Sequence, residues 1–361
     1  MQFDTVLDTA SQLLAAIDPQ QQHSDLLSHL QRTQAIRIAP TRGPANEPDL
    51  VCVDGGVAHE QTDALTWIAA VGVSSDLRSS VPATMVMPVS SETDRARSML
   101  MALCELAAAL DTADRSHVVW MDGSLATPLI SIATGLLTSD PTTAELVCAT
   151  LADCNTDTLI GDYVHYGLQG RLRALPKQDT ASGYCKLWAA QLGEGSGAWL
   201  NMQRDRIAAT SVLQSGEYLR PRRADEALRV TAKATADAPK PVREWAHVID
   251  ELLGHWREEL PVFVTYVLPR GMPLRAVKIE YTLSADVDDA DIDDVADSVA
   301  ADLCAKVSET IIGTRVIEPF PQHQADTFAK REVTSLITQL MGAASRTFSE
   351  THPAGIRHYR T

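Results

Sequence analysis

The chain lacks the short motifs that identify several common protein classes. Its six cysteines include no Cys-x-x-Cys pair, which disfavours a zinc knuckle. It contains no Gly-x-x-x-x-Gly-Lys phosphate loop, no Gly-x-Ser-x-Gly nucleophile turn and no His-Glu-x-x-His pair. No strand–helix unit frames the glycine-rich segment 193–197, so it does not predict a dinucleotide site. The acidic run 286–294 lacks the glycine and terminal glutamate of a calcium loop, and we expect a solvated helix start there.

Basic charge is also scarce. The chain has 31 Lys and Arg against 47 Asp and Glu, a formal net charge of -16 and a pI of about 5.0. This balance disfavours a protein that coats nucleic acid through bulk charge, but it is compatible with an acidic metal site beside a local basic groove. No apolar run approaches the roughly 18 residues of a membrane span, and no signal peptide is recognisable. We therefore expect a soluble cytoplasmic protein.

The 361 residues, 45% of them hydrophobic, suffice for one large domain or two ordinary ones. Leucines at helical spacing in residues 4–36 predict two helices, and the Pro- and Gly-containing stretch 40–48 predicts a linker. Two interpretations of this N-terminal part are open. It is either a helical cap on the core or an arm that packs on another subunit.

The order of elements after the linker indicates the fold. Apolar strand patterns are followed by Asp54 and, further along, by Asp122. Between them we expect strands at 64–73 and 83–89 and a helix at 92–111. Three strands, a helix and a fourth strand are the opening of a ribonuclease H-like α/β fold, with a mixed sheet flanked by helices. Further helices are expected at 126–137, 142–153, 242–257, 290–310 and 323–347, and further strands at 262–268 and 276–282.

Three carboxylates occupy prominent places in this pattern. Asp54 and Asp122 each end a strand pattern and precede a glycine, and Glu105 is the only charge in residues 99–110. A buried carboxylate costs several kcal/mol unless a cation or hydrogen bonds offset it. Converging carboxylates suit divalent metals, which phosphodiester-cleaving enzymes often use in pairs. The alternative is that both Asp-Gly pairs are turns and that Glu105 is one exposed charge on an alanine-rich helix.

Cations and one further carboxylate extend this candidate site. Lys177 follows a proline and is placed to present an ammonium to a phosphate, although a surface turn is the alternative. Arg220 belongs to a small basic cluster that fits either a nucleic-acid path or a solvated surface. Asp326 falls in the first turns of the last predicted helix, where it is either a further metal ligand or a favourable charge at a helix start. Lys330 and Arg331 lie one turn further on.

With these motifs in place, the chain resembles the NurA family of nucleases. The resemblance runs from about residue 49 to 334 and rests on Glu105 and on the segments 53–56, 121–125, 175–180, 216–218, 277–281 and 319–326. It implies a ribonuclease H-like core and a homodimer that acts as a manganese- or magnesium-dependent nuclease on DNA ends, beside a HerA-type hexameric ATPase. Many family members carry a tyrosine and a histidine eight residues apart in the last motif. Here Glu318 and Asp326 hold that spacing.

The sequence therefore predicts a metal-dependent DNA nuclease, in DNA end processing and repair or in anti-phage defence. The predicted parts are an N-terminal arm and linker (1–48), a nuclease domain (49–334) with an insertion at about 160–240, and a C-terminal helix end and tail (335–361). The predicted metal ligands are Asp54, Glu105, Asp122 and Asp326, with Lys177 as a catalytic cation. The predicted DNA contacts are Lys177, Arg206, Arg220, Lys278, Lys330 and Arg331. Two alternatives are an inactive scaffold subunit of a translocase and an actin-like ATPase, although no second copy of the first half is recognisable.

Overall fold

The structure, a computed structural model, describes residues 19–41, 50–116, 118–177, 181–224, 230–270, 275–311 and 318–348. One sheet contains the strands β1 (Ile36–Ile38), β2 (Cys52–Gln61), β3 (Leu65–Ser74), β4 (Ser80–Pro88), β5 (Val119–Met121), β6 (Leu172–Ala174), β7 (Glu217–Leu219), β8 (Arg222–Arg223), β9 (Val262–Val267) and β10 (Val277–Thr282). The helices are α2 (Pro19–Arg32), α3 (Thr93–Ser116), α4 (Thr127–Gly135), α5 (Pro141–Asp153), α6 (Thr156–Leu168), α7 (Gly183–Ser196), α8 (Asp205–Val212), α9 (Lys240–Glu259), α10 (Ile292–Thr310) and α11 (Phe320–Phe348), with a 3₁₀ turn at Ala198–Met202. No described helix is both long and apolar enough to cross a membrane.

The strand order confirms the predicted α/β fold with a mixed sheet. The strands lie in the order β1-β7-β9-β10-β6-β5-β2-β3-β4, with β8 paired to β9. β2, β3 and β4 form an antiparallel meander, α3 crosses over it, and β5 then pairs parallel with β2. β6 continues parallel to β5, whereas β10 and β9 return antiparallel.

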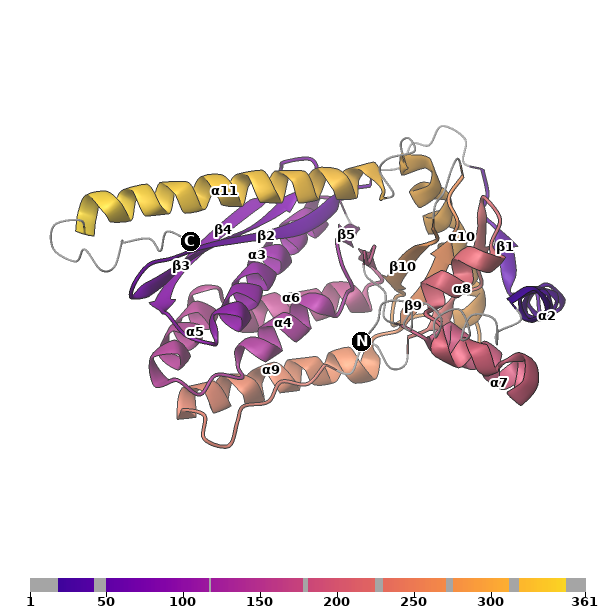
Figure 1. Cartoon of the computed structure of the whole chain (residues 1–361), viewed down its shortest axis with the longest axis horizontal. Helices are drawn as coiled ribbons and strands as arrows, with labels where there is room; N and C mark the ends of the chain where they lie inside the picture. Colours follow the sequence, from indigo (N-terminus) through magenta and orange to yellow (C-terminus); the bar gives the residue numbers. More distant parts are fainter. Residues whose placement is uncertain are drawn as a thin grey trace, which may run out of the picture.

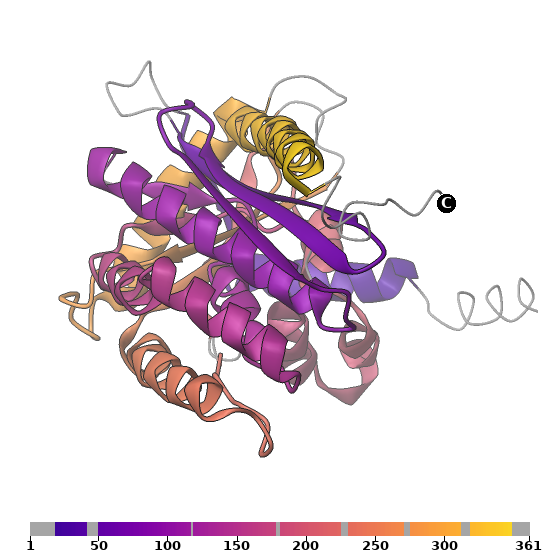
Figure 2. The same cartoon turned by 90° about the vertical axis from the view of Figure 1, so that its left-hand side faces the viewer.

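Helices cover both faces of the sheet, as alternate residues of β9 illustrate. Val264 and Tyr266 pack in a cluster with α2, α7 and α8, whereas Phe263 and Val267 pack on the opposite face with α10. Along the rest of the sheet, the first face carries α3, α4, α5, α6 and α9. The second face carries α11, which lies along the β2–β3 hairpin (Figure 1). Figure 2 shows α3 and α11 on opposite sides of this hairpin.

The strand that carries Asp54 is longer than the sequence predicted. The apolar run was expected to end at Asp54, but β2 continues to Gln61, so Asp54-Gly55 is not a turn. The glycines are needed because helices approach both faces of the strand. A methyl group on Gly55 would lie 2.9 Å from Met101 Cγ of α3, and one on Gly56 would lie 2.7 Å from the Ala329 carbonyl oxygen of α11. Both contacts are closer than real side chains allow, so the glycine pair permits tight packing inside a strand.

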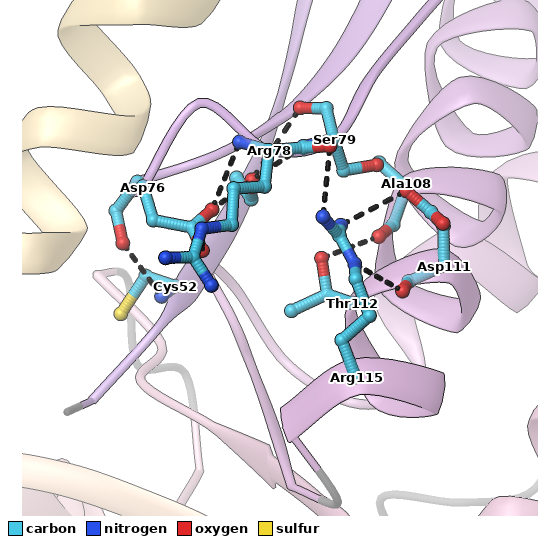
Figure 3. Close-up of polar contacts among 10 residues, drawn as sticks. Cys52, Asp76, Arg78, Ser79, Ala108, Asp111, Thr112 and Arg115 are labelled. Atoms are coloured by element: carbon cyan, nitrogen blue, oxygen red, sulfur yellow. Dashed lines mark hydrogen bonds and ion pairs between the residues drawn. The ribbon is translucent and has the colours of Figure 1, made fainter. Parts of the chain in front are cut away.

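Hydrogen bonds anchor the β3–β4 turn and the start of β2 (Figure 3). The Asp76 carboxylate accepts from the Arg78 N–H at 3.1 Å within the turn. Arg115, near the end of α3, donates to the Arg78 carbonyl at 2.8 Å and so ties the turn to the helix. Ser75 Oγ accepts from the Cys52 N–H at 3.1 Å, two residues before Asp54. These bonds fix the β3–β4 turn against α3 and against the start of β2.

The remaining predicted elements correspond well to observed ones. The helices expected at 126–137, 142–153, 242–257, 290–310 and 323–347 are α4, α5, α9, α10 and α11, and the strands at 262–268 and 276–282 are β9 and β10. The insertion predicted at about 160–240 contains most of α6, the helices α7 and α8, and the strands β6 to β8. Of the N-terminal part, α2 packs through Leu26 and Leu30 on the core formed with α7 and α8. Residues 1–18 lie outside the described part.

Candidate metal centre

Three carboxylates meet where β5 separates from β2. The two strands pair only through Cys52–Trp120 and Val53–Met121, after which β5 ends while β2 continues. Asp122 is the next residue after β5, and its N–H donates to the Val53 carbonyl at 2.8 Å. Asp54 alternates with Gly55 along β2, so it points to the face covered by α11.

Asp326 of α11 completes the group. One carboxylate oxygen each from Asp54, Asp122 and Asp326 lies within 4.8 Å of the others. Within the described residues this is the group of acidic, histidine and cysteine side chains placed to hold a metal ion. A set of oxygen donors suits hard divalent cations such as Mn²⁺ and Mg²⁺.

The electrostatics of the group indicate a shortage of positive charge. Burial and the neighbouring Asp122 raise the pKa of Asp54 to about 9. Carboxylates this close repel one another, so Asp54 keeps a proton at neutral pH in the metal-free protein. A divalent cation would displace that proton. The residues present therefore fit a divalent metal both in donor type and in charge.

Glu105 approaches the group from the opposite face of β2. It lies on α3 beside Gly55, where a methyl group would be 3.4 Å from Glu105 Oε2. Its side chain is buried, and burial together with the charge of Asp122 raises its pKa to about 8. Glu105 lies outside the group that meets within 4.8 Å, so it neighbours the three aspartates without converging with them.

Lys177 is the cation at the centre of this cluster. Its Nζ lies 2.6 Å from Asp122 Oδ2, 3.2 Å from Glu318 Oε2 and 3.8 Å from Asp326 Oδ1. Burial acts to lower the pKa of Lys177, but the hydrogen bond and charge of Asp122, with Asp54 and Glu318, raise it above its ordinary value. The ammonium is therefore charged at neutral pH, and about a third of the side chain remains exposed.

A row of side chains at the start of α11 faces the site. Gln322, which was not among the predicted site residues, donates from Nε2 to Asp122 Oδ1 at 2.7 Å and to the Leu175 carbonyl at 2.8 Å. Residues four apart share a helix face. Within α11 the polar residues with this spacing are Gln322, Asp326 and Lys330, and Glu318 lies two residues before the helix. The spacing from Asp326 was the signal that would have identified Gln322.

Two residues predicted to contact DNA are buried in contacts with protein groups. Arg206 donates to the Pro176 carbonyl and, at 2.6 Å, to the Lys177 carbonyl, which fixes the backbone that carries the ammonium. Lys278 Nζ lies 2.9 Å from Glu280 Oε1. Both cations are buried, and the structure gives each a protein partner where the sequence predicted a DNA contact.

Glu280 is a second residue that the sequence analysis did not assign to the site. Its Oε2 accepts from Ser124 Oγ at 2.7 Å and from the Leu125 N–H at 2.9 Å. Ser124 and Leu125 follow Asp122 directly, so this buried carboxylate fixes the loop that presents a metal-ligand candidate.

The other predicted DNA contacts are exposed but not equally close to the cluster. Lys330 pairs with Asp326 at 2.7 Å and is 73% exposed, and Arg331 beside it is exposed. Arg220 follows β7. Four strands lie between β7 and β2, namely β9, β10, β6 and β5. At about 4.8 Å per strand spacing this amounts to about 24 Å. The structure therefore brings Lys177 and Lys330 to the carboxylates, but not Arg220.

The fold of this chain is that of NurA nucleases. The crystal structure of the NurA nuclease from Sulfolobus solfataricus matches with a TM-score of 0.55 and 12% identity, over 95% of this chain and 96% of that chain. A crystal structure of NurA with manganese matches with a TM-score of 0.50 and 10% identity, over 94% of this chain and 98% of that chain. No protein-family model and no curated protein matches the sequence.

Proposed function

We propose that this protein, which has the NurA fold, is a metal-dependent nuclease that hydrolyses phosphodiester bonds in DNA. The observation that carries the proposal is the group of Asp54, Asp122 and Asp326, whose oxygens lie within 4.8 Å of one another beside the buried Glu105. The existence of a manganese-containing structure of this fold supports the choice of a divalent metal.

The three aspartates would hold the metal, and Glu105 would add a fourth negative charge behind them. When bound, Mn²⁺ or Mg²⁺ would lower the pKa of a water molecule and neutralise charge on the phosphate. Gln322 keeps Asp122 oriented through the hydrogen bond to Oδ1. Glu280 holds the following loop, so Asp122 is supported from two elements besides its own strand.

Lys177 would stabilise the negative charge that develops on the scissile phosphate, because its ammonium lies beside the carboxylates and remains partly exposed. Arg206 contributes by fixing the Lys177 backbone rather than by touching the DNA. The exposed cations Lys330 and Arg331 would contact the DNA backbone next to the site, and Arg220 would meet it further along its path.

We further propose that the nuclease works as a homodimer with a HerA-type hexameric ATPase, in DNA end processing, repair or anti-phage defence. The net charge of -16 supports a delivered substrate, because such an exterior repels free DNA. An inactive scaffold would not need the complete set of carboxylates. An actin-like ATPase would need two similar halves, whereas the described residues form one sheet.

The test is digestion of end-labelled single- and double-stranded DNA, with Mn²⁺, with Mg²⁺ and with chelator. We expect cutting that needs metal and that falls at least about 100-fold in Asp122→Asn, which keeps the shape of the side chain but removes a charged ligand. The exposed helical substitution Glu145→Gln serves as the matched control and should retain activity. Digestion in chelator, or full activity of folded Asp122→Asn, would contradict the proposal.

A further inference from the structure

Lys177 occupies the position in which its charge opposes that of an entering metal. Its Nζ lies 2.6 Å from Asp122 Oδ2, and Asp122 belongs to the carboxylate group that fits a divalent cation. The ammonium also lies 3.8 Å from Asp326 Oδ1. A divalent cation among these oxygens would repel an ammonium at such distances. This repulsion would favour movement of the ammonium away from Asp122 when a metal binds.

Glu318 lies where the displaced ammonium would go. Its Oε2 is 3.2 Å from Lys177 Nζ, and it is not part of the carboxylate group that meets within 4.8 Å. The transfer requires only a small movement of the lysine tip, because Nζ already lies 3.2 Å from Glu318 Oε2, and Arg206 fixes the Lys177 backbone. Asp122 would stay in place during the transfer, since Gln322 holds its other oxygen at 2.7 Å.

We propose that Glu318 is a positioning residue that takes the Lys177 ammonium from Asp122 when a divalent cation binds, so that metal and lysine occupy the site together. The inference rests on the proposed metal centre but not on DNA cleavage. It assigns Glu318 a role through Lys177 and not as a metal ligand. In the metal-free protein, Lys177 acts as a built-in cation that holds the aspartates together.

The test is the affinity for Mn²⁺ without DNA, measured on chelator-treated protein by the electron paramagnetic resonance signal of free Mn²⁺. Lys177→Gln should bind Mn²⁺ about tenfold more tightly, because the competing charge is gone. Glu318→Gln should bind about tenfold more weakly, because the ammonium then stays at Asp122. In the Lys177→Gln background, Glu318→Gln should change the affinity less than about threefold.

The control is Glu332→Gln, which removes a charge from the same helix about 9 Å beyond Asp326 and should leave the affinity unchanged. Circular dichroism would verify folding, and Glu318→Ala, which also removes the carboxylate, replaces Glu318→Gln in the cycle if the latter does not fold. An equal loss of affinity from the Glu318 substitution with and without Lys177 would make Glu318 a ligand and overturn the inference. Unchanged affinity of folded Glu318→Gln would overturn it as well.

The two proposals fail in different ways. If the wild-type protein binds no Mn²⁺, both the metal centre and the inference are wrong. Suppose instead that Mn²⁺ binds, that Glu318→Gln weakens this binding only when Lys177 is present, and that DNA is not cut. The nuclease function is then wrong and the inference stands.

Discussion

Replacing Glu105 by glutamine should stabilise the metal-free protein, by an amount that grows with pH. Burial and the charge of Asp122 raise the pKa of Glu105 from 4.5 to about 8. Between these pH values the unfolded chain has lost a proton that the folded protein keeps. The free energy of unfolding therefore falls as the pH rises through this window, and it stays lower above it.

The shift sets the size of the effect. At about 1.4 kcal/mol per pKa unit, the ionised Glu105 lowers the stability at pH 9 by on the order of 5 kcal/mol, and by less than about 1 kcal/mol at pH 5. The glutamine is isosteric and uncharged, so Glu105→Gln should remove this penalty. At about 2 °C per kcal/mol for a large chain, the melting temperature at pH 9 should rise by roughly 10 °C.

The assay is thermal unfolding in chelator at pH 5, 7 and 9, repeated with saturating Mn²⁺. The exposed helical substitution Glu145→Gln is the control and should not alter the pH dependence. If the proposed metal centre is right, Mn²⁺ would bind the folded state and offset the repulsion between the carboxylates, so it should stabilise the wild-type protein more than Glu105→Gln. A Glu105→Gln protein that is less stable than wild type at pH 9, or equally shifted at every pH, would refute the assigned burial and charge repulsion.

Three further substitutions test the support of the site. Glu280→Gln should destabilise the protein by about 1–3 kcal/mol in urea unfolding, because it breaks the buried ion pair with Lys278 and weakens the hydrogen bonds to Ser124 and Leu125; an unchanged unfolding midpoint would contradict this role. Gly56→Ala should lower the stability of the fold by about 1–3 kcal/mol, because its methyl group would lie 2.7 Å from the Ala329 carbonyl oxygen and push α11 from β2. The same shift should lower the affinity for Mn²⁺, which titration calorimetry measures. Arg206→Met should reduce DNA turnover more than the affinity for Mn²⁺, because it frees the Lys177 backbone, and equal losses in kinetic and binding assays would contradict this role.

Periodicity in the sequence was sufficient to place most helices and strands, because the apolar pattern of each reflects its own burial. It failed at Gly55 and Gly56, where glycines normally favour a turn and here allow two helices to approach one strand. That contact depends on α3 and α11, which are distant in sequence. The sequence therefore predicted that strand to end too early.

The candidate site, too, was only partly predictable from the sequence. Asp54, Glu105, Asp122 and Asp326 were predicted as one set of metal ligands, because carboxylates stand out against apolar neighbours, and the three aspartates of this set meet in the structure. The supporting residues Gln322 and Glu280 were missed, because a buried amide or carboxylate gains meaning only from its partners. Their partners come from other strands and loops, and only the folded chain brings them together.

The position of α11 has a consequence for the order of events during protein synthesis. A chain that has folded β2 through β5 already presents Asp54 and Asp122, but Asp326 and Gln322 emerge from the ribosome only with the last described helix. The group of three carboxylates cannot assemble until that helix docks against Gly56. If the protein is the proposed nuclease, a half-made chain would therefore lack activity, because its chemistry would await completion of the fold.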